Sequence, residues 1–189
     1  MPDSVSAVAE SVTCRGERFR LYLDADTIAR RVEAIGRAIS EEYDGQRPIL
    51  IGVLNGAYMF LADLMRAVTI DCEVDFLKLS SYGAEKVSSG TVTELKKIDA
   101  NLEGRHVIVV EDIVDTGLSM QFIVDLLGEL NPASVKTVTL LHKKAAANPE
   151  LDLTLDWVGF EIDNLFVIGY GLDYGQLARN LPAIYILDE

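Results

Sequence analysis

Residues 106–120, HVIVVEDIVDTGLSM, decide the fold, because an apolar run leads into two adjacent carboxylates and then into a turn of small residues. Residues 107–110 are β-branched and apolar on both faces, as a parallel strand covered by helices requires. Glu111 and Asp112 then fall at the carboxyl end of this strand. Open α/β sheets bind their ligands outside the carboxyl ends of the strands. The stretch therefore predicts a buried strand that delivers two acids to a site.

A phosphate-binding loop is predicted to follow this strand directly. Gly117 can adopt a positive φ, and Thr116 and Ser119 offer hydroxyl groups. The helix predicted at 119–130 would direct its first N–H groups toward an anion. An ordinary strand-to-helix turn is the alternative, and an acid pair after a strand is by itself a weak signal.

Helices and strands alternate along most of the chain, which predicts an α/β fold with a mainly parallel sheet flanked by helices. A helix at 26–43 is indicated by apolar residues at helical spacing, and a second follows Gly56. The polar segment 81–92 is predicted to be the tip of a long hairpin. Further strands are predicted at 48–54, 73–80, 91–98, 135–141, 153–158, 165–170 and 183–187.

Composition limits the classes of protein that the chain can be. Its 189 residues suffice for one domain, 49% are hydrophobic, and no apolar run reaches the length of a membrane span. The first residues lack the pattern of a signal peptide, so we expect a cytoplasmic protein with Cys14 and Cys72 reduced. A net charge of −13 argues against a nucleic-acid partner. The same charge would repel a phosphorylated substrate unless metal ions or local cations reverse it.

Residues 110–117, VEDIVDTG, resemble the phosphoribosyl pyrophosphate signature of the type I phosphoribosyltransferases, in the form found in hypoxanthine-guanine phosphoribosyltransferases. The resemblance extends over roughly residues 15–188. It implies the phosphoribosyltransferase (Rossmann-like) fold, with a core at about 26–145 and a small hood made by the N-terminal segment and about 150–189, all within one domain. It also implies Mg²⁺ as cofactor and a homodimer or homotetramer.

The resemblance assigns the ribose phosphate to the loop. Glu111 and Asp112 would hold the ribose hydroxyls and Mg²⁺. Asp115 would be the general acid/base at purine N7, and we expect it to be partly buried near other acids, which would raise its proton affinity. The residues implied to bind the ribose and its 5′-phosphate are Glu111, Asp112, Asp115, Thr116, Gly117, Leu118 and Ser119.

Base recognition is implied for a second group of residues. Lys143 matches the lysine that donates to the 6-oxo group, which would reject adenine because adenine presents an amino group there. Without the resemblance, Lys143 reads as a solvent-facing lysine with Lys144 as its rival. Phe166 would stack on the base and the backbone of Val167 would read its edge, although both also suit an ordinary core strand. Leu165, Phe166, Val167 and Asp173 complete the implied base site with Lys143, and Leu165 stands where a lysine is common.

Pyrophosphate binding is implied for Asn55, Gly56 and Arg179. Residues 54–57, LNGA, match a loop that contains a non-proline cis peptide, but Asn55 stands where many relatives have lysine. Asp173 matches an aspartate that binds a second Mg²⁺. Read alone, Asp173 is a turn residue and Arg179 a surface charge. Ser81 and Tyr82 match the start of a closing lid that would exclude water.

The implied function is Mg²⁺-dependent purine salvage, in which phosphoribosyl pyrophosphate and hypoxanthine or guanine give IMP or GMP and pyrophosphate. A preference for xanthine is an alternative that the side chains do not settle. A nucleotide-sensing, RNA-binding regulator on the same fold is a further alternative. The acidity and the intact acids argue against the regulator.

Overall fold

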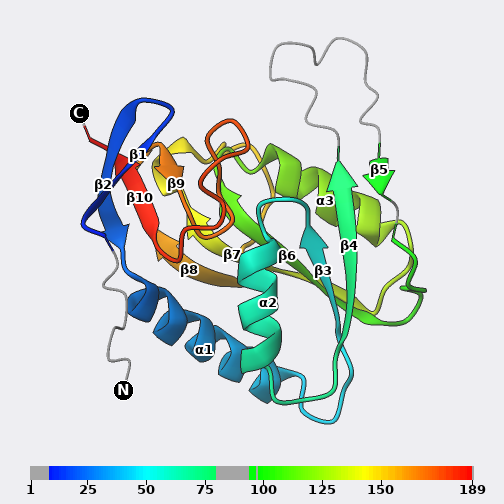
Figure 1. The fold of residues 1–189 in the computed structure, drawn as a ribbon. Coiled ribbons are helices and arrows are strands. Elements are labelled where there is room, and N and C mark those ends of the chain that lie inside the picture. The colour runs from blue at the N-terminus through cyan, green and yellow to red at the C-terminus, as the bar shows by residue number, and fades with distance from the viewer. Residues whose placement is uncertain (1–8, 80–93, 97, 189) are drawn as a thin grey trace, which may run out of the picture.

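Two β-sheets organise the structure, a computed structural model that describes residues 9–79, 94–96 and 98–188. The larger sheet has six strands in the order β5-β4-β3-β6-β7-β8, and all neighbours are parallel except β4 and β5. The predicted mainly parallel sheet is therefore confirmed (Figure 1). Its strands are β3 (Ile49–Val53), β4 (Glu73–Leu79), β5 (Glu94–Lys96), β6 (His106–Val114), β7 (Ser134–His142) and β8 (Trp157–Glu161).

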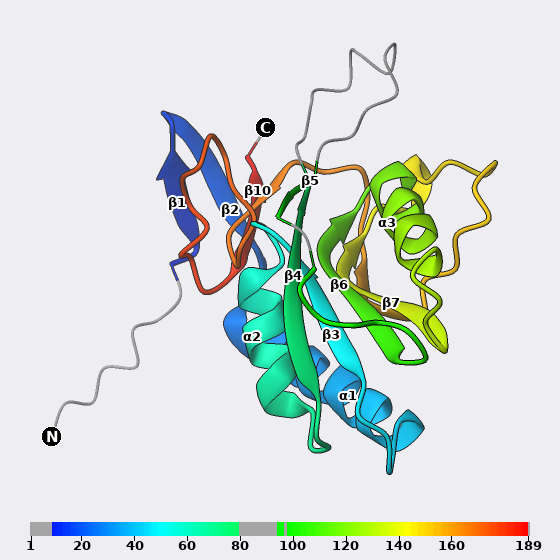
Figure 2. The ribbon, with the colours of Figure 1, turned by 90° about the vertical axis from the view of Figure 1, so that its right-hand side faces the viewer.

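Helices cover both faces of this sheet (Figure 2). Helices α1 (Ala25–Glu42) and α2 (Tyr58–Ala67) pack on one face, and α3 (Leu118–Gly128) packs on the other. Strand β6 serves both layers, since Ile108 and Val110 join the core under α1 and α2 while Val107 and Val109 join the core under α3. The apolar run in β6 is thus buried on both faces, as predicted.

Local signals explain where the first helix begins and how it packs. The carboxylate of Asp24 accepts a hydrogen bond from the N–H of Thr27 at 2.7 Å and caps α1. Gly36 lies where α1 crosses α2, and a Cβ there would come within 2.5 Å of the Cβ of Ala67. No helix in the described parts of the chain is long and apolar enough to cross a bilayer.

The smaller sheet has the order β1-β2-β10-β9, with antiparallel neighbours throughout. Its strands are β1 (Ser11–Cys14), β2 (Glu17–Leu23), β9 (Val167–Ile168) and β10 (Ile184–Leu187). Phe19 and Tyr185 fill the core between this sheet and the loop at 170–181. The hairpin of β1 and β2 was not predicted as strands, because Arg18 and Arg20 interrupt its apolar residues; their alternation with Phe19 is the signal that could have found it.

Three predicted strands have wrong boundaries. The strand predicted at 165–170 is reduced to β9 (Val167–Ile168). Strand β6 continues to Val114, so Glu111 and Asp112 lie within the strand; the pairing of Ile113 with Leu141 on β7 extends it. The strand predicted at 153–158 begins only at Trp157. In the preceding segment the carboxylate of Asp156, not a backbone group, accepts the hydrogen bond from the N–H of Thr137. Backbone pairing with β7 therefore begins only at Trp157. A short 3₁₀ turn, η1 (Lys144–Ala146), follows β7.

Asp75 fixes the chain that returns to the sheet after β5. This buried carboxylate accepts from the N–H groups of Phe76, Asp99 and Ala100 and pairs with the Lys96 ammonium. Burial alone would raise its pKa, but the Ala100 amide, the Lys96 ammonium and the other amides together lower the pKa to about 2. The charged form of Asp75 therefore stabilises the fold.

We expect Asp75→Asn to lower the free energy of unfolding at pH 7 by about 2 kcal/mol. Because the folded-state pKa of Asp75 lies below its unfolded value, this contribution is present above about pH 4 and disappears as the pH falls toward 2. Urea unfolding at pH 7, 4 and 3 measures the difference between the two proteins. Asp99→Asn is the control, since the Asp99 side chain is exposed and shares only Lys96. Equal stability of wild type and Asp75→Asn at pH 7 would contradict the assignment.

Candidate active site at the carboxyl edge of the sheet

The loop after β6 has the geometry of an anion cradle. Gly117 is the N-cap of α3 and has a φ of +87°. The first N–H groups of the helix have no partner within the helix and lie at the loop. The carbonyl of Thr116 accepts from the N–H of Asn148 at 3.0 Å, which holds the loop from outside. A cavity of about 100 Å³ lies within the loop. It is lined by Glu111, Ile113, Val114, Asp115, Thr116, Gly117, Ser119 and Met120, whereas Leu118 is exposed beside it.

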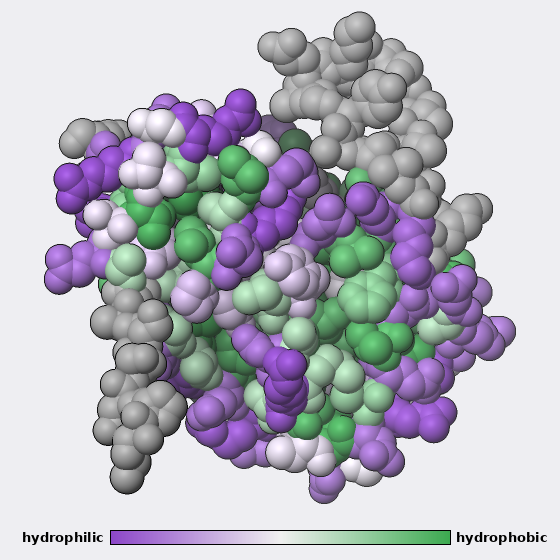
Figure 3. Space-filling model, in the orientation of Figure 1, coloured by the Kyte–Doolittle hydropathy of each residue, from purple (hydrophilic) through white to green (hydrophobic). Residues whose placement is uncertain are grey.

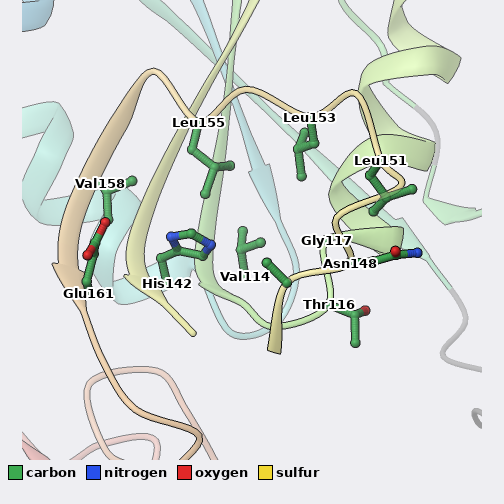
Figure 4. Close-up of a pocket in the computed structure, with 11 residues that line it drawn as sticks. Val114, Thr116, Gly117, His142, Asn148, Leu151, Leu153, Leu155, Val158 and Glu161 are labelled. Atoms are coloured by element: carbon green, nitrogen blue, oxygen red, sulfur yellow. The ribbon is translucent and has the colours of Figure 1, made fainter. Parts of the chain in front are cut away.

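A second cavity, of about 280 Å³, lies behind the same loop. Figure 4 shows Leu153 and Leu155 pointing toward Val114 and His142 across it. A Cβ on Gly117 would come within 3.0 Å of Leu153 and 3.2 Å of Leu151. Gly117 is therefore required both for its positive φ and for the close approach of this leucine segment.

Asp112 of the acid pair is buried beside the loop that follows β3, and Glu111 is partly buried next to it in the strand. A Cβ on Gly56 would overlap the Asp112 carboxylate, at 1.8 Å from its Oδ2, so only glycine allows this contact. Burial, reinforced by the charge of Asp112, raises the pKa of Glu111 well above its usual value. Burial also raises the pKa of Asp112, although Arg179 acts in the opposite direction. The pair thus forms a site where an added cation would be strongly stabilised.

The loop at 54–57 meets this pair through its backbone. The peptide bond between Leu54 and Asn55 is cis, as predicted. A Cβ on Gly171 would lie 2.1 Å from the carbonyl oxygen of Gly56, so the turn that carries Gly171 packs directly on the loop. The side-chain oxygen of Asn55 accepts from the ammonium of Lys78 at 3.2 Å. Lys78 had not been singled out from the sequence, because a lysine near the end of a strand reads as a solvated charge.

Asp173 and Arg179 lie together at the same edge. Their side chains form an ion pair at 2.6 Å, and the Arg179 guanidinium also donates to the carbonyl of Gly171 at 2.7 Å. Asp173 accepts in addition from the N–H of Gln176. Asp173 therefore does stabilise a turn, as its interpretation without the family suggested. Arg179 is only 20% exposed and ion-paired, so its interpretation as a surface charge is wrong.

Asp115 and Lys143 form the next ion pair, at 3.0 Å. The prediction that Asp115 is partly buried among acids is wrong: its side chain is 49% exposed, because Asp115 lies beyond the last residue of β6 and faces a cation. The Lys143 side chain is only 12% exposed, so the alternative interpretation of Lys143 as a solvent-facing lysine is wrong. Lys144 points to Glu161 instead. Of the two rival lysines, Lys143 is the one that joins the site.

The predicted base-stacking segment lies between the two sheets. Val167 is buried in β9, whereas the Phe166 ring is 47% exposed and contacts the rings of Phe19 and Tyr174 at 6.2 and 5.3 Å. The Phe166 ring is thus half exposed and packed against two other rings. The alternative interpretation of Phe166 as a core strand residue is wrong. Leu165 packs against the main core. Ser81 and Tyr82 lie outside the described residues.

An open parallel sheet with an anion cradle and an acid pair at its carboxyl edge defines an α/β protein that binds phosphorylated ligands. A family model for the phosphoribosyl transferase domain matches residues 21–175. The chain therefore belongs to the phosphoribosyltransferase family.

Two curated relatives illustrate the similarity. The chain is 42% identical to the hypoxanthine-guanine phosphoribosyltransferase of Aquifex aeolicus, over 93% of this chain and 98% of the relative. It is 44% identical to the bifunctional protein TilS/HprT of Listeria monocytogenes over 89% of this chain, but it spans only 26% of that longer relative.

A solved structure agrees in fold. The hypoxanthine-guanine phosphoribosyltransferase of Bacillus anthracis, with a HEPES molecule in its active site, has a TM-score of 0.83 and 37% identity, covering 89% of this chain and 98% of the other.

We expect Glu111→Gln to stabilise the protein at neutral pH by on the order of 1 kcal/mol. Since the folded-state pKa of Glu111 lies above its unfolded value, ionisation of Glu111 destabilises the fold as the pH rises through that pKa. The gain should therefore shrink toward pH 4. Thermal unfolding at pH 4, 6 and 8 measures it, with Glu129→Gln as an exposed control. A variant less stable than wild type at pH 8 would refute the argument.

Proposed function

We propose that the chain is a hypoxanthine-guanine phosphoribosyltransferase, which transfers the 5-phosphoribosyl group from phosphoribosyl pyrophosphate to N9 of a 6-oxopurine. The observation that carries the proposal is the Asp115–Lys143 pair beside the phosphate loop. O6 and N7 are neighbours on one edge of a 6-oxopurine, and an ammonium beside a carboxylate offers a donor to the first and a proton acceptor to the second. The similarity to hypoxanthine-guanine enzymes supports the same substrates.

The residues divide the substrate between them. The loop at 115–119 would hold the 5′-phosphate through its N–H groups and hydroxyls, and the acid pair would hold the ribose hydroxyls. The backbone of the 54–57 loop and the guanidinium of Arg179 would hold pyrophosphate. Phe166 would stack on the base and the backbone of Val167 would read its edge, with Leu165 as a packing residue.

The reaction then needs one proton transfer by the chain. N9 bonds to the ribosyl carbon while pyrophosphate leaves with the electrons of the broken C–O bond, through a transition state with cationic character on the ribose. The carboxylate of Asp115 would take the proton from N7 as this happens. Lys143 would donate to O6, where charge develops on the purine.

Mg²⁺ suits the acids at this edge. The described residues contain no cluster of three His, Cys, Asp or Glu side chains placed to hold a metal. One or two carboxylates are enough for Mg²⁺ when substrate oxygens and waters complete its shell, and the pair Glu111 and Asp112 favours a cation. Asp173 could contribute a further carboxylate oxygen, although one of its oxygens is paired with Arg179. The metal would neutralise the departing pyrophosphate.

The remaining expectations concern organisation. We propose that the four-stranded sheet acts as the hood over the base, and that the protein is a cytoplasmic homodimer or homotetramer. Apolar surface extends over α2 and β4, where Tyr58 and Val74 are 38% and 44% exposed, which supports association (Figure 3). The molar mass measured by light scattering during size-exclusion chromatography gives the oligomeric state directly.

The deciding experiment is the initial rate of pyrophosphate release with phosphoribosyl pyrophosphate, Mg²⁺ and each of hypoxanthine, guanine, xanthine and adenine. Turnover with the first two and none with adenine is expected. A clear preference for xanthine would replace the proposed substrate within the same class. No pyrophosphate release with any of the four bases, together with salt-dependent RNA binding, would favour the alternative of an RNA-binding regulator.

We expect Asp115→Asn to lower kcat by about 100-fold or more while changing the KM for hypoxanthine only slightly, because general acid/base catalysis acts in the transition state. Steady-state kinetics on both proteins test this. An unchanged kcat would remove Asp115 from the proton-transfer role.

We expect Lys143→Ala to raise the KM for hypoxanthine by about 10-fold and to reduce the discrimination against adenine, because the donor to O6 is lost. Lys144→Ala is the matched control, since the Lys144 ammonium pairs with Glu161 outside the site, and it should behave like wild type. If both variants keep the wild-type preference among bases, Lys143 does not read O6.

A further inference from the structure

The ammonium of Lys78 lies beside the loop proposed to bind pyrophosphate. Strands β3 and β4 run parallel with Val53 opposite Leu77, and the N–H of Leu54 donates to the carbonyl of Leu77 at 2.9 Å. This pairing brings the end of β4 next to the 54–57 loop. Lys78 then reaches the side chain of Asn55, with its Nζ 3.2 Å from Asn55 Oδ1.

The partner of Lys78 differs in charge from the partners of the other cations at this edge. Arg179 faces the carboxylate of Asp173, and Lys143 faces that of Asp115. Within the described residues, Lys78 has a neutral amide oxygen as its hydrogen-bond partner. Among the described residues, no carboxylate pairs with its positive charge, and an amide releases an ammonium to an incoming anion more readily than a carboxylate does.

Pyrophosphate needs such a charge here. It carries several negative charges at neutral pH, the protein has a net charge of −13, and the Asp112 carboxylate lies directly against Gly56. Backbone N–H groups of the loop can orient an anion, but they supply only partial charges. A full positive charge at the entrance to the loop would offset the local repulsion.

We propose that Lys78 is a binding residue for the pyrophosphate group, held at the loop by Asn55 until the ligand takes its ammonium. This inference rests on the proposed function, because it assigns pyrophosphate to the 54–57 loop. It makes Asn55 a positioning residue whose side chain keeps the cation at hand while the loop backbone contacts the ligand.

Binding measurements on the whole protein separate this role from a general effect of charge. Titration calorimetry with Mg²⁺-pyrophosphate and with IMP compares a ligand that occupies the pyrophosphate site with one that does not. Lys78→Met should weaken Mg²⁺-pyrophosphate binding by about 10-fold and leave IMP within about 2-fold. Arg30→Met, the same change of charge on the exposed face of α1, should alter neither. The loss should become smaller as salt is added.

Two further variants test whether charge and position carry the effect. Lys78→Arg should keep most of the affinity, and Asn55→Lys added to Lys78→Met should restore it, because the cation then comes from the loop itself. Unchanged pyrophosphate binding in Lys78→Met, equal losses for both ligands, or an arginine variant as weak as the methionine variant would overturn the role of Lys78. Wild-type protein that binds neither ligand would instead refute the proposed function, and this inference with it.

Discussion

The contact between the Asp112 carboxylate and the Gly56 peptide is the constraint on which the site depends. It joins the loop after β3 to the carboxyl end of β6, and Gly171 packs against the carbonyl of Gly56. Three segments far apart in the sequence thus meet at Gly56. A β-carbon at Gly56 would collide with the Asp112 carboxylate and displace it from the loop.

The charged side chains at the carboxyl edge of the larger sheet lie in pairs. Asp112 is buried and Glu111 is partly buried beside it, and both have raised pKa values, whereas Asp115 and Asp173 each face a cation. A protein with a surplus of acids can keep such a cluster folded because the apolar layers on both faces of β6 stabilise the strand that carries it. The carboxylates of Glu111 and Asp112 therefore lie where a metal and phosphates would bind, and the ion pairs Asp115–Lys143 and Asp173–Arg179 lie around them.

Much of this architecture could be predicted from residues with strong local rules. The run at 107–110 favours a buried strand, Gly117 permits a positive φ, and the apolar spacing at 26–43 favours a helix; the structure confirms all three. The family was also identified from the sequence, by the VEDIVDTG motif together with four further motifs in the expected order, and the family model confirms it. What failed depended on pairing between distant segments: the extension of β6 along β7, the late start of β8 and the exposure of Asp115. The position of Lys78 against Asn55 belongs to the same class, because only the parallel register of β3 and β4 brings them together.

The main chain also sets the distance between the phosphate loop and Lys143. The N–H of Lys143 donates to the carbonyl of Val114 at 2.9 Å, and the N–H of Asn148 donates to that of Thr116 at 3.0 Å. These bonds tie the segment that carries the lysine to the loop at two points, and neither bond involves a side chain. Under the proposed function, these bonds fix the distance between the position of the 5′-phosphate and the position of the base. A substitution at Lys143 would then change the contacts with the base but not this distance.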